Sequence, residues 1–344
     1  MPAGSRTADY DFDLPPDLIA QTPAARRDDS RLMVLNRKAG TISHHRFSDF
    51  PGFLTAGDAL VLNSSKVIRA RLLGTRDSGA SAEVMLIKSL GAGRYEAMVH
   101  PGGKLKPGRR ISVSPQLEVE ILETTERRTR IVQLRSDLPF DEAIERFGHI
   151  PLPPYIRRGD VVDDASRYQT VYAREPGSVA APTAGLHFTP EVLDAIKKRD
   201  VNIAEVVLHV GAGTFKPVEV EDPAQHVMHE EWFSISNDAA DVLNATRRAG
   251  GAITAVGTTA VRTLESAVSG GMLAPASGET AIFIRPGYEF KAVDRLLTNF
   301  HLPRSTLLML VAAFAGYEFA MEAYRTAIKE KYGFYSYGDA MLIV

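Results

Sequence analysis

The feature that most constrains the fold is a change of pattern along the chain. Between Val67 and Leu134, short runs in which apolar and polar residues nearly alternate are separated by glycine and proline. Such alternation is typical of strands buried on one face, and several closely spaced strands favour a small antiparallel sandwich or barrel. The expected elements are strands at 67–73, 82–90, 95–100, 110–113, 117–123 and 130–134, and a short helix at 140–147.

Helix and strand patterns alternate after a stiff, extended connector, Pro151-Leu-Pro-Pro154. Thr189, followed by a proline and an acid, is a helix start signal. Asn237 and Ser305 are expected to cap two further helices. Alternation of this kind predicts an α/β layer with functional sites at the ends of its strands. The expected strands of this layer include 203–210 and 253–256.

The length of 344 residues is enough for about two domains. The first 60 residues show no core of their own, so we expect them to belong to the α/β part. The sequence therefore predicts a two-domain α/β (α+β) protein in which a small all-β antiparallel domain interrupts the other domain. The expected boundaries are 1–64 and 154–344 for a discontinuous α/β catalytic domain and 65–153 for the inserted all-β domain.

The composition excludes several classes of protein. No cysteine is present, which excludes disulfides, cysteine-bound zinc, iron–sulfur clusters and thiol catalysis. The longest apolar run, 306–316, is shorter than the ~20 residues of a membrane-spanning helix, and the N-terminus lacks the apolar region of a signal peptide. We therefore expect a cytoplasmic protein that has no membrane partner.

Basic residues are concentrated in the first part of the expected β domain. From Lys66 to Arg110 there are ten basic and three acidic residues, although the net charge of the whole chain is −2. A local surplus of this size is typical of a surface that binds a polyanion such as a nucleic acid. The alternative interpretation is a solvated basic face without a partner.

Four polar, glycine-rich segments lie at the expected junctions between strands and loops, where functional sites usually form. Taken singly, their glycines could allow tight turns, their threonines could cap helices and their histidines could fill the core. Because all four fall on successive elements of one α/β layer, we expect them to line one pocket. Neighbouring helix N-termini would offer unpaired N–H groups to an anion. The segments are 182–189, 209–217, 256–265 and 298–305.

Two common nucleotide-binding motifs are not found. The segment after His209 lacks the third glycine of a dinucleotide-binding motif and has Lys216-Pro217 where the helix should start, and there is no P-loop motif. Histidines leave a metal-dependent hydrolase open as an alternative, because His187, His209, His226 and His229 are residues of a type that zinc uses. An RNA-binding module without catalysis is a third possibility.

Taken together, the motifs resemble one family, the S-adenosylmethionine:tRNA ribosyltransferase-isomerases of queuosine biosynthesis. The most specific parts of the resemblance are Pro182-Thr-Ala-Gly-Leu-His-Phe188 and Thr298-Asn-Phe-His-Leu-Pro303. The chain departs from the family at Asn63-Ser-Ser-Lys66, at Arg69 and at Gly333. The last two bear on RNA contacts, and none of the three lies in the four segments. Further matching motifs lie at 11–15, 21–32, 62–63, 70–72, 152–155, 167–172 and 337–343.

The resemblance implies a barrel-like α/β domain with an inserted all-β barrel. It implies an enzyme of the pentosyltransferase class, both transferase and isomerase. The ribosyl group of S-adenosylmethionine would be transferred to 7-aminomethyl-7-deazaguanine at the wobble position of tRNA and isomerised, giving epoxyqueuosine-tRNA, adenine and methionine. S-adenosylmethionine is then the ribosyl-donor substrate and the anticodon arm of tRNA the partner. No metal, redox cofactor or obligate protein partner is expected.

This chemistry requires a base that removes a proton next to the sulfonium, a donor for the departing adenine and an anion site for the methionine carboxylate. The expected catalytic residues are His187, His209, His229 and Glu231. Those expected to bind S-adenosylmethionine are Thr183, Gly185, Gly211, Gly213, Thr214, Thr258, Thr259, Arg262 (as the carboxylate ligand), Asn299, His301 and Ser305. Those expected to bind tRNA are Arg27, Arg31, Lys66, Arg71, Lys104, Lys106, Arg109 and Arg110. Tyr155, Tyr168, Phe188 and Phe300 are candidates for stacking on a base, with core packing as the alternative.

Overall fold

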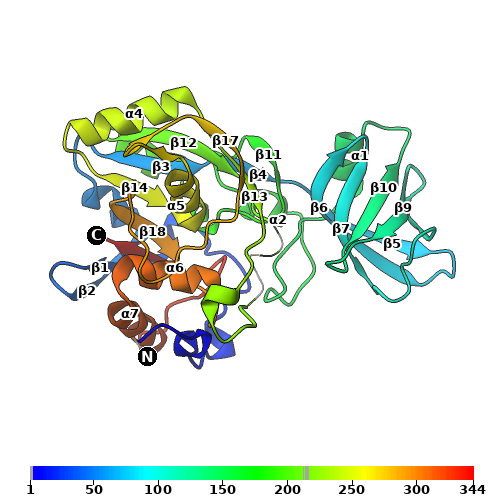
Figure 1. The fold of residues 1–344 in the computed structure, drawn as a ribbon, viewed down its shortest axis with the longest axis horizontal. Coiled ribbons are helices and arrows are strands. Elements are labelled where there is room, and N and C mark those ends of the chain that lie inside the picture. The colour runs from blue at the N-terminus through cyan, green and yellow to red at the C-terminus, as the bar shows by residue number, and fades with distance from the viewer. Residues whose placement is uncertain (1–2, 212, 214–216) are drawn as a thin grey trace.

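The computed structural model describes residues 3–211, 213 and 217–344 and consists of a large mixed sheet covered by helices and a separate β-barrel. Figure 1 shows the barrel standing to one side of the large sheet, joined to it by extended chain segments. The expectation of a mixed α/β fold with an inserted antiparallel barrel is confirmed.

The large sheet combines strands from before and after the barrel in the sequence. The first three strands, β1 to β3, all belong to it. The strands β12, β3, β14 and β18 are parallel neighbours, so their carboxyl ends meet at one edge of the sheet. The order is β17 (Ala276–Thr280), β13 (Glu231–Ile235), β12 (Asn202–Leu208), β3 (Ala59–Asn63), β14 (Ile253–Val256), β18 (Arg295–Asn299), β19 (Ala340–Ile343), β1 (Arg31–Asn36) and β2 (Thr41–Arg46).

Both faces of this sheet are buried. Along β3, Ala59 and Val61 contribute to one core, and Leu60 and Leu62 contribute to the other, as the two-residue period of a strand requires. The first core includes residues of α4 (Asn237–Arg248), α5 (Gly257–Ser266), α6 (Thr306–Ala315) and α7 (Tyr317–Lys329). The second includes residues of η4 (Phe47–Phe53) and α3 (Pro190–Lys197).

Two of the three predicted helix caps are confirmed. The hydroxyl of Thr189 accepts the N–H of Val192, and that of Ser305 accepts the N–H of Leu308. The prediction for Asn237 was wrong, because Ser236 caps this helix and Asn237 is its first residue. Serine and asparagine are both common N-cap residues, so the residue types alone did not distinguish the two adjacent candidates.

No single helix of the described chain is long and apolar enough to cross a membrane. Helices α6 and α7 pass that test only as a pair, and they are bent by 115° where they meet.

The barrel is closed and antiparallel. Its interior is filled by apolar side chains that alternate along the strands, with Val84, Ile111 and Val119 fully buried. Residues of the helix α1 (Phe140–Phe147), which has the predicted bounds, pack against this core. The strand order is β10 (Arg130–Arg135), β7 (Arg94–His100), β6 (Ser81–Gly91), β5 (Arg71–Arg76), β8 (Arg110–Ser114) and β9 (Leu117–Thr124).

The predicted strand at 67–73 is two strands in the structure. The first, β4 (Ser65–Val67), pairs with β11 (Glu175–Ser178) outside the barrel, and the second, β5, belongs to the barrel. Between β4 and β5 the chain passes from the part that contains the large sheet into the barrel, and no local sequence pattern indicates this passage. The remaining elements are β15 (Val268–Ser269), β16 (Met272–Leu273), α2 (Asp164–Arg167), η1 (Thr7–Tyr10), η2 (Pro16–Leu18), η3 (Arg27–Asp29), η5 (Thr183–His187) and η7 (Pro223–Gln225).

Candidate functional site

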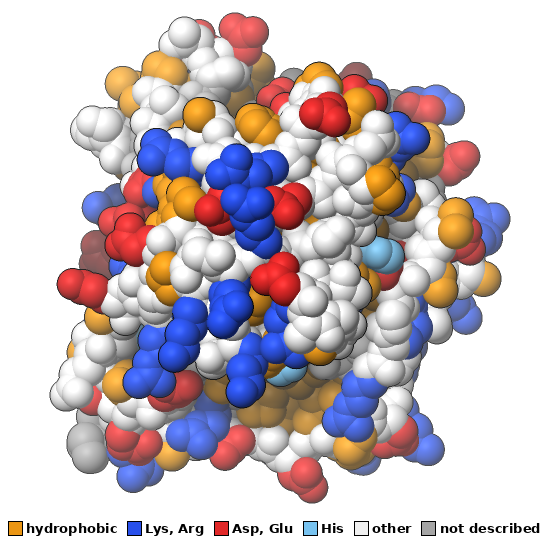
Figure 2. All heavy atoms as spheres, turned by 90° about the vertical axis from the view of Figure 1, so that its right-hand side faces the viewer, with side chains coloured by type: hydrophobic (Ala, Val, Ile, Leu, Met, Phe, Trp, Pro, Cys, Tyr) orange, Lys and Arg blue, Asp and Glu red, His pale blue; other side chains and the backbone are white. Residues whose placement is uncertain are grey.

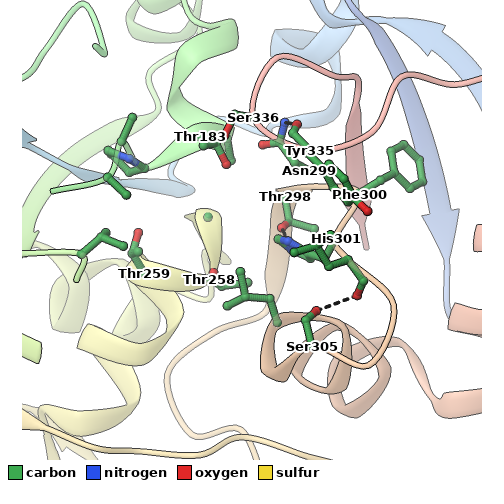
Figure 3. A pocket seen from close by; sticks show the side chains of 18 of the residues that line it. Thr183, Thr258, Thr259, Thr298, Asn299, Phe300, His301, Ser305, Tyr335 and Ser336 are labelled. Atoms are coloured by element: carbon green, nitrogen blue, oxygen red, sulfur yellow. Dashed lines mark hydrogen bonds between the residues drawn. The ribbon is translucent and has the colours of Figure 1, made fainter. Parts of the chain in front are cut away.

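A pocket lies where the parallel strands of the large sheet end. Its space amounts to about 650 Å³, open solvent included. All four segments singled out from the sequence contribute residues to its walls. Figure 3 shows Thr258 and Thr259 on one side and Thr298 to His301 on the other. The polar and aromatic lining residues are Tyr155, Thr183, Thr258, Thr259, Thr298, Asn299, Phe300, His301, Ser305, Tyr335 and Ser336.

The described residues that line this pocket, which we call the neutral pocket, carry no formal charge. Among the described residues that line it, none is Asp, Glu, Lys or Arg. The only histidine among them, His301, is buried, and burial lowers its pKa to about 3. Its Nε2 lies 2.8 Å from the hydroxyl of Thr298. The pocket therefore favours an uncharged ligand moiety over an ion.

The first turn of α5 forms part of the wall. This helix starts directly after β14, at Gly257, whose φ of +85° favours glycine. Among the described residues, no side chain caps its N-terminus. The helix thus begins three residues earlier than a cap at Thr259 would require, which places both Thr258 and Thr259 in the first turn, facing the pocket.

His187 does not line this pocket, although the neighbouring residues Thr183 and Ala184 do. Its ring is buried, and it lines a small adjoining cavity together with Arg27 and Ser30. Its Nδ1 lies 2.7 Å from the hydroxyl of Ser30, and its Nε2 lies 3.2 Å from Nδ2 of Asn299. Burial lowers its pKa to about 4, so the ring is neutral near pH 7.

A second, wider cavity separates the barrel from the large sheet. The space of this interdomain cleft amounts to about 2360 Å³, open solvent included, and the cleft shares Val210 with the neutral pocket. It holds the other group of expected site residues, namely Lys66, His209, Gly211, Gly213, His229 and Glu231. Thr214 lies outside the described residues.

His209 is a partly buried titratable group of the cleft. Its ring stacks on the indole of Trp232, with ring centroids 5.1 Å apart. Its Nδ1 is buried and has no hydrogen-bond partner in the described part of the chain. Partial burial lowers its pKa, which keeps the imidazole neutral and able to accept a proton. His229 is exposed.

Glu231 and Arg262 form a buried ion pair. Oε2 of Glu231 accepts from Nη1 of Arg262, and Oε1 accepts the N–H of Gly211 at 2.8 Å. The pair thus connects α5 with the start of the segment after β12. Within the described residues, Nε and Nη2 of Arg262 are buried and have no partner. These two atoms form one edge of the guanidinium, the edge that binds a carboxylate bidentately.

Two of the glycines have packing reasons for being glycine. A Cβ on Gly185 would lie 2.1 Å from the hydroxyl oxygen of Tyr172, and one on Gly213 would lie 2.3 Å from Cδ2 of His229. Among the described residues, a Cβ on Gly211 would meet only Glu231, at 3.8 Å. Close packing therefore accounts for Gly185 and Gly213 without a ligand.

The residues expected to bind tRNA fall into two groups. In the first, the charge already has a local partner: Arg71 pairs with Glu83, and Arg110 lies near Glu118 and Glu120. Arg27 donates to the carbonyls of Leu186 and Ser166, and Arg31 stacks on Tyr332. In the second group, Lys66, Lys104, Lys106 and Arg109 are exposed and have no acidic partner among the described residues.

Lys104, Lys106 and Arg109 lie in the loop between β7 and β8, which we call the basic loop (101–109). The buried Arg130 supports this loop by donating to the carbonyls of Gly102 and Leu105. Figure 2, which views the barrel end of the molecule, shows Lys and Arg side chains gathered on this face with acidic side chains between them. The cleft itself is different, because the described residues that line it include three basic and six acidic side chains.

The aromatic candidates also divide. Tyr168 and Phe188 are fully buried and do not line the neutral pocket, whereas Tyr155 and Phe300 do. Sequence reasoning missed Ser30, Tyr335 and Ser336 as site residues. The matching motifs at 21–32 and 337–343 include or adjoin them, and that was the available signal.

The histidines of the alternative metal site do not converge. His187 lies in the cavity beside the neutral pocket, while His209 and His229 line the interdomain cleft. Within residues 3–211, 213 and 217–344, no group of three or more His, Cys, Asp or Glu side chains could hold a metal ion.

The fold and the site define a class: a mixed α/β protein with an inserted antiparallel barrel, in which a neutral pocket at the strand ends adjoins a cleft between the two parts. The family model described as "Queuosine biosynthesis protein" matches residues 7–343. The chain therefore belongs to the queuosine biosynthesis protein family.

Individual relatives match over the full length. S-adenosylmethionine:tRNA ribosyltransferase-isomerase of Symbiobacterium thermophilum is 52% identical, covering 98% of this chain and 100% of the relative. The protein of the same name from Syntrophomonas wolfei is 53% identical, covering 98% and 97%. A crystal structure of S-adenosylmethionine tRNA ribosyltransferase from Thermotoga maritima is 43% identical and covers 97% of this chain and 99% of that chain, with a TM-score of 0.57.

Proposed function

We propose that this chain catalyses the reaction for which its relatives are named, as an S-adenosylmethionine:tRNA ribosyltransferase-isomerase. It transfers and isomerises the ribosyl group of S-adenosylmethionine onto 7-aminomethyl-7-deazaguanine in tRNA, which gives epoxyqueuosine-tRNA and releases adenine and methionine. The observation that carries this function is identity of about half the residues over the full length of the named relatives. The expected motifs at one pocket add support.

Within this function, we assign S-adenosylmethionine to the neutral pocket and the space beside it. Arg262 is the candidate ligand of the methionine carboxylate, because its Nε and Nη2 are buried donors without partners in the described chain. Its ion pair with Glu231 fixes the guanidinium and makes an acid–base role for Glu231 less suitable than a positioning role.

Among the histidines, His209 is the best candidate for the base. Both ring nitrogens of His187 lie within hydrogen-bond distance of Ser30 or Asn299, which assigns that residue to positioning. His209 has a buried Nδ1 without a described partner and a lowered pKa, and it lies in the cleft that adjoins the neutral pocket. A base needs a lone pair that no other protein group occupies, and it must be neutral at the working pH.

For the tRNA, we assign the basic loop and Lys66 to phosphate contacts with the anticodon arm. Exposed cations without acidic partners bind phosphates at low desolvation cost, whereas Arg71 and Arg110 would first have to leave their carboxylates. We retain residues 65–153 as the inserted domain, with its barrel at 71–135. Because tRNA is the substrate, we place the reaction in the cytoplasm.

Adenine release from S-adenosylmethionine, measured with and without tRNA that carries the precursor base, tests the function. Release that depends on both substrates supports the proposal. A metal-dependent hydrolase would instead contain stoichiometric zinc and lose activity with a chelator. An RNA-binding module would bind tRNA without releasing adenine, and that result would refute the proposed function.

A further inference from the structure

Two polar atoms of residues that line the neutral pocket have no hydrogen-bond partner in the described part of the chain. They are Oδ1 of Asn299 and Oγ1 of Thr259, and both atoms are buried. Figure 3 places the two residues on opposite sides of the pocket. Since buried polar atoms in native proteins are nearly always satisfied by protein, ligand or water, each of these atoms is open to a contact with a ligand.

The orientation of the Asn299 amide is fixed by its surroundings. Its Nδ2 donates to the backbone carbonyl of Tyr335 at 3.0 Å, and a carbonyl can only accept. The second hydrogen of the same nitrogen points to Nε2 of His187, 3.2 Å away. Both amide hydrogens are thus used inside the protein, and Oδ1, an acceptor, is the atom left for a ligand.

The tautomer of His187 is fixed by the same chain of hydrogen bonds. Because Nε2 accepts from Asn299, the ring proton is on Nδ1, which donates to the hydroxyl of Ser30 at 2.7 Å. That hydroxyl donates in turn to the carbonyl of Arg27, at 3.3 Å. The ring also stacks on Phe47, with centroids 5.1 Å apart, which restricts its rotation. Ser30 and His187 therefore hold Asn299 in one orientation.

The rest of the pocket limits what can donate to this oxygen. An ammonium group would be buried there without a carboxylate, because no acidic residue is among the described residues that line the pocket. Of the moieties in the two substrates, the bases are the large uncharged ones that carry N–H donors. The aromatic rings of Tyr155, Phe300 and Tyr335 and the small side chains of Ala180, Ala181 and Ala184 supply apolar walls for such a ring.

We infer that the neutral pocket binds a purine-type base and that Oδ1 of Asn299 accepts a hydrogen bond from the exocyclic amine of that base. Thr259 contacts the opposite edge of the base through its hydroxyl, and Ser30 and His187 are positioning residues for Asn299. This inference rests on the proposed function. The adenine of S-adenosylmethionine and the deazaguanine of tRNA share this chemistry, so the experiment distinguishes them.

The test compares dissociation constants for the wild type and for Asn299→Ala. One arm uses S-adenosylmethionine and its analogue without the 6-amino group. The other uses acceptor tRNA and the same tRNA with an acceptor base that lacks the 2-amino group. Asn299→Ala should weaken the natural ligand roughly tenfold in one arm, and it should have no effect there on the analogue without the amine. Equal weakening of each ligand and its analogue, in both arms, would overturn the inference.

The positioning role is tested by residues outside the pocket. Ser30→Ala should weaken the same ligand several-fold, Ser30→Thr should restore binding because it keeps the hydroxyl, and neither change should affect the analogue without the amine. A purely structural role of Ser30 would instead lower the melting temperature and weaken ligand and analogue equally, which would overturn the assignment.

A matched control is Asn244→Ala. The side-chain nitrogen of Asn244 donates to the carbonyl of Leu273 and its side-chain oxygen accepts the N–H of Leu273, away from the pocket. It should lower stability without any difference between ligand and analogue. Adenine release by the wild type reports on the proposed function separately, so a failure of that function is distinguishable from a failure of this inference.

Discussion

Replacement of Thr259 by valine should make the protein more stable and less active. The hydroxyl of Thr259 is buried without a partner in the described chain, whereas the methyl group of valine has the same shape and needs no hydrogen bond. A buried unsatisfied hydroxyl costs about 1–3 kcal/mol, so Thr259→Val should raise the free energy of unfolding by about 1 kcal/mol. For a chain of this size that is a rise in melting temperature of roughly 2 °C.

The loss of activity has the same origin. If the hydroxyl contacts the substrate, its removal costs about 1 kcal/mol of binding, which lowers kcat/KM roughly fivefold. Thermal unfolding and steady-state adenine release measure the two effects on one preparation. The control is Thr263→Val, one turn further along α5, because the Thr263 hydroxyl donates to the carbonyl of Thr259 at 3.0 Å. This control should lose stability. A Thr259→Val variant with unchanged kcat/KM and unchanged stability would refute the reasoning.

Three further predictions concern the effect of pH on stability, the binding of tRNA by the basic loop and the packing of Gly185. Burial lowers the pKa of His187 to about 4 and that of His301 to about 3, so protons bind the unfolded state more readily than the folded state. Stability is therefore full above pH 6.5, and the free energy of unfolding should fall by about 2 kcal/mol per histidine at pH 5. Urea titrations at both pH values should show a smaller decrease for His301→Gln than for the wild type. Combined replacement of Lys104, Lys106 and Arg109 by alanine should weaken tRNA binding and reduce the slope of log K against log salt concentration by about 2–3. Arg110→Ala is the control and should change this slope less, because the charge of Arg110 lies near Glu118 and Glu120. Equal slopes for the wild type and the triple variant would show that the basic loop does not contact tRNA. Gly185→Ala should lower the free energy of unfolding by about 1–3 kcal/mol, because its Cβ would lie 2.1 Å from the hydroxyl oxygen of Tyr172. Adding Tyr172→Phe should recover part of that loss in thermal unfolding. No recovery would show that this contact is not the cause.

The barrel was predictable because its strands follow a local rule. Apolar residues alternate along each strand, glycine and proline separate the strands, and the interior is filled by those same apolar residues. The break between β4 and β5 was not predictable in this way. It depends on pairing of Ser65–Val67 with Glu175–Ser178, more than a hundred residues away, and the intervening sequence contains neither glycine nor proline at the break.

The candidate site was predictable at the level of segments but not of individual atoms. Residues that follow parallel strands must meet at one edge of the sheet, so the four polar segments contribute to one pocket. Which side chains face that pocket depends on partners distant in sequence. His187 turns to Ser30, and Arg262 turns to Glu231. The local surplus of basic residues did not show which charges have a partner, since the acids near Arg110 lie on the next strand, β9.

The central claim is that S-adenosylmethionine serves this protein as a donor of its ribosyl group to tRNA. The most direct measurement uses S-adenosylmethionine labelled with carbon-13 throughout the ribose, precursor tRNA and the purified protein, followed by digestion and mass spectrometry of the nucleosides. The account predicts a modified nucleoside that carries every labelled ribose carbon, together with unlabelled adenine. A tRNA without label, or one that acquires only the methyl group when that group is labelled instead, would contradict it.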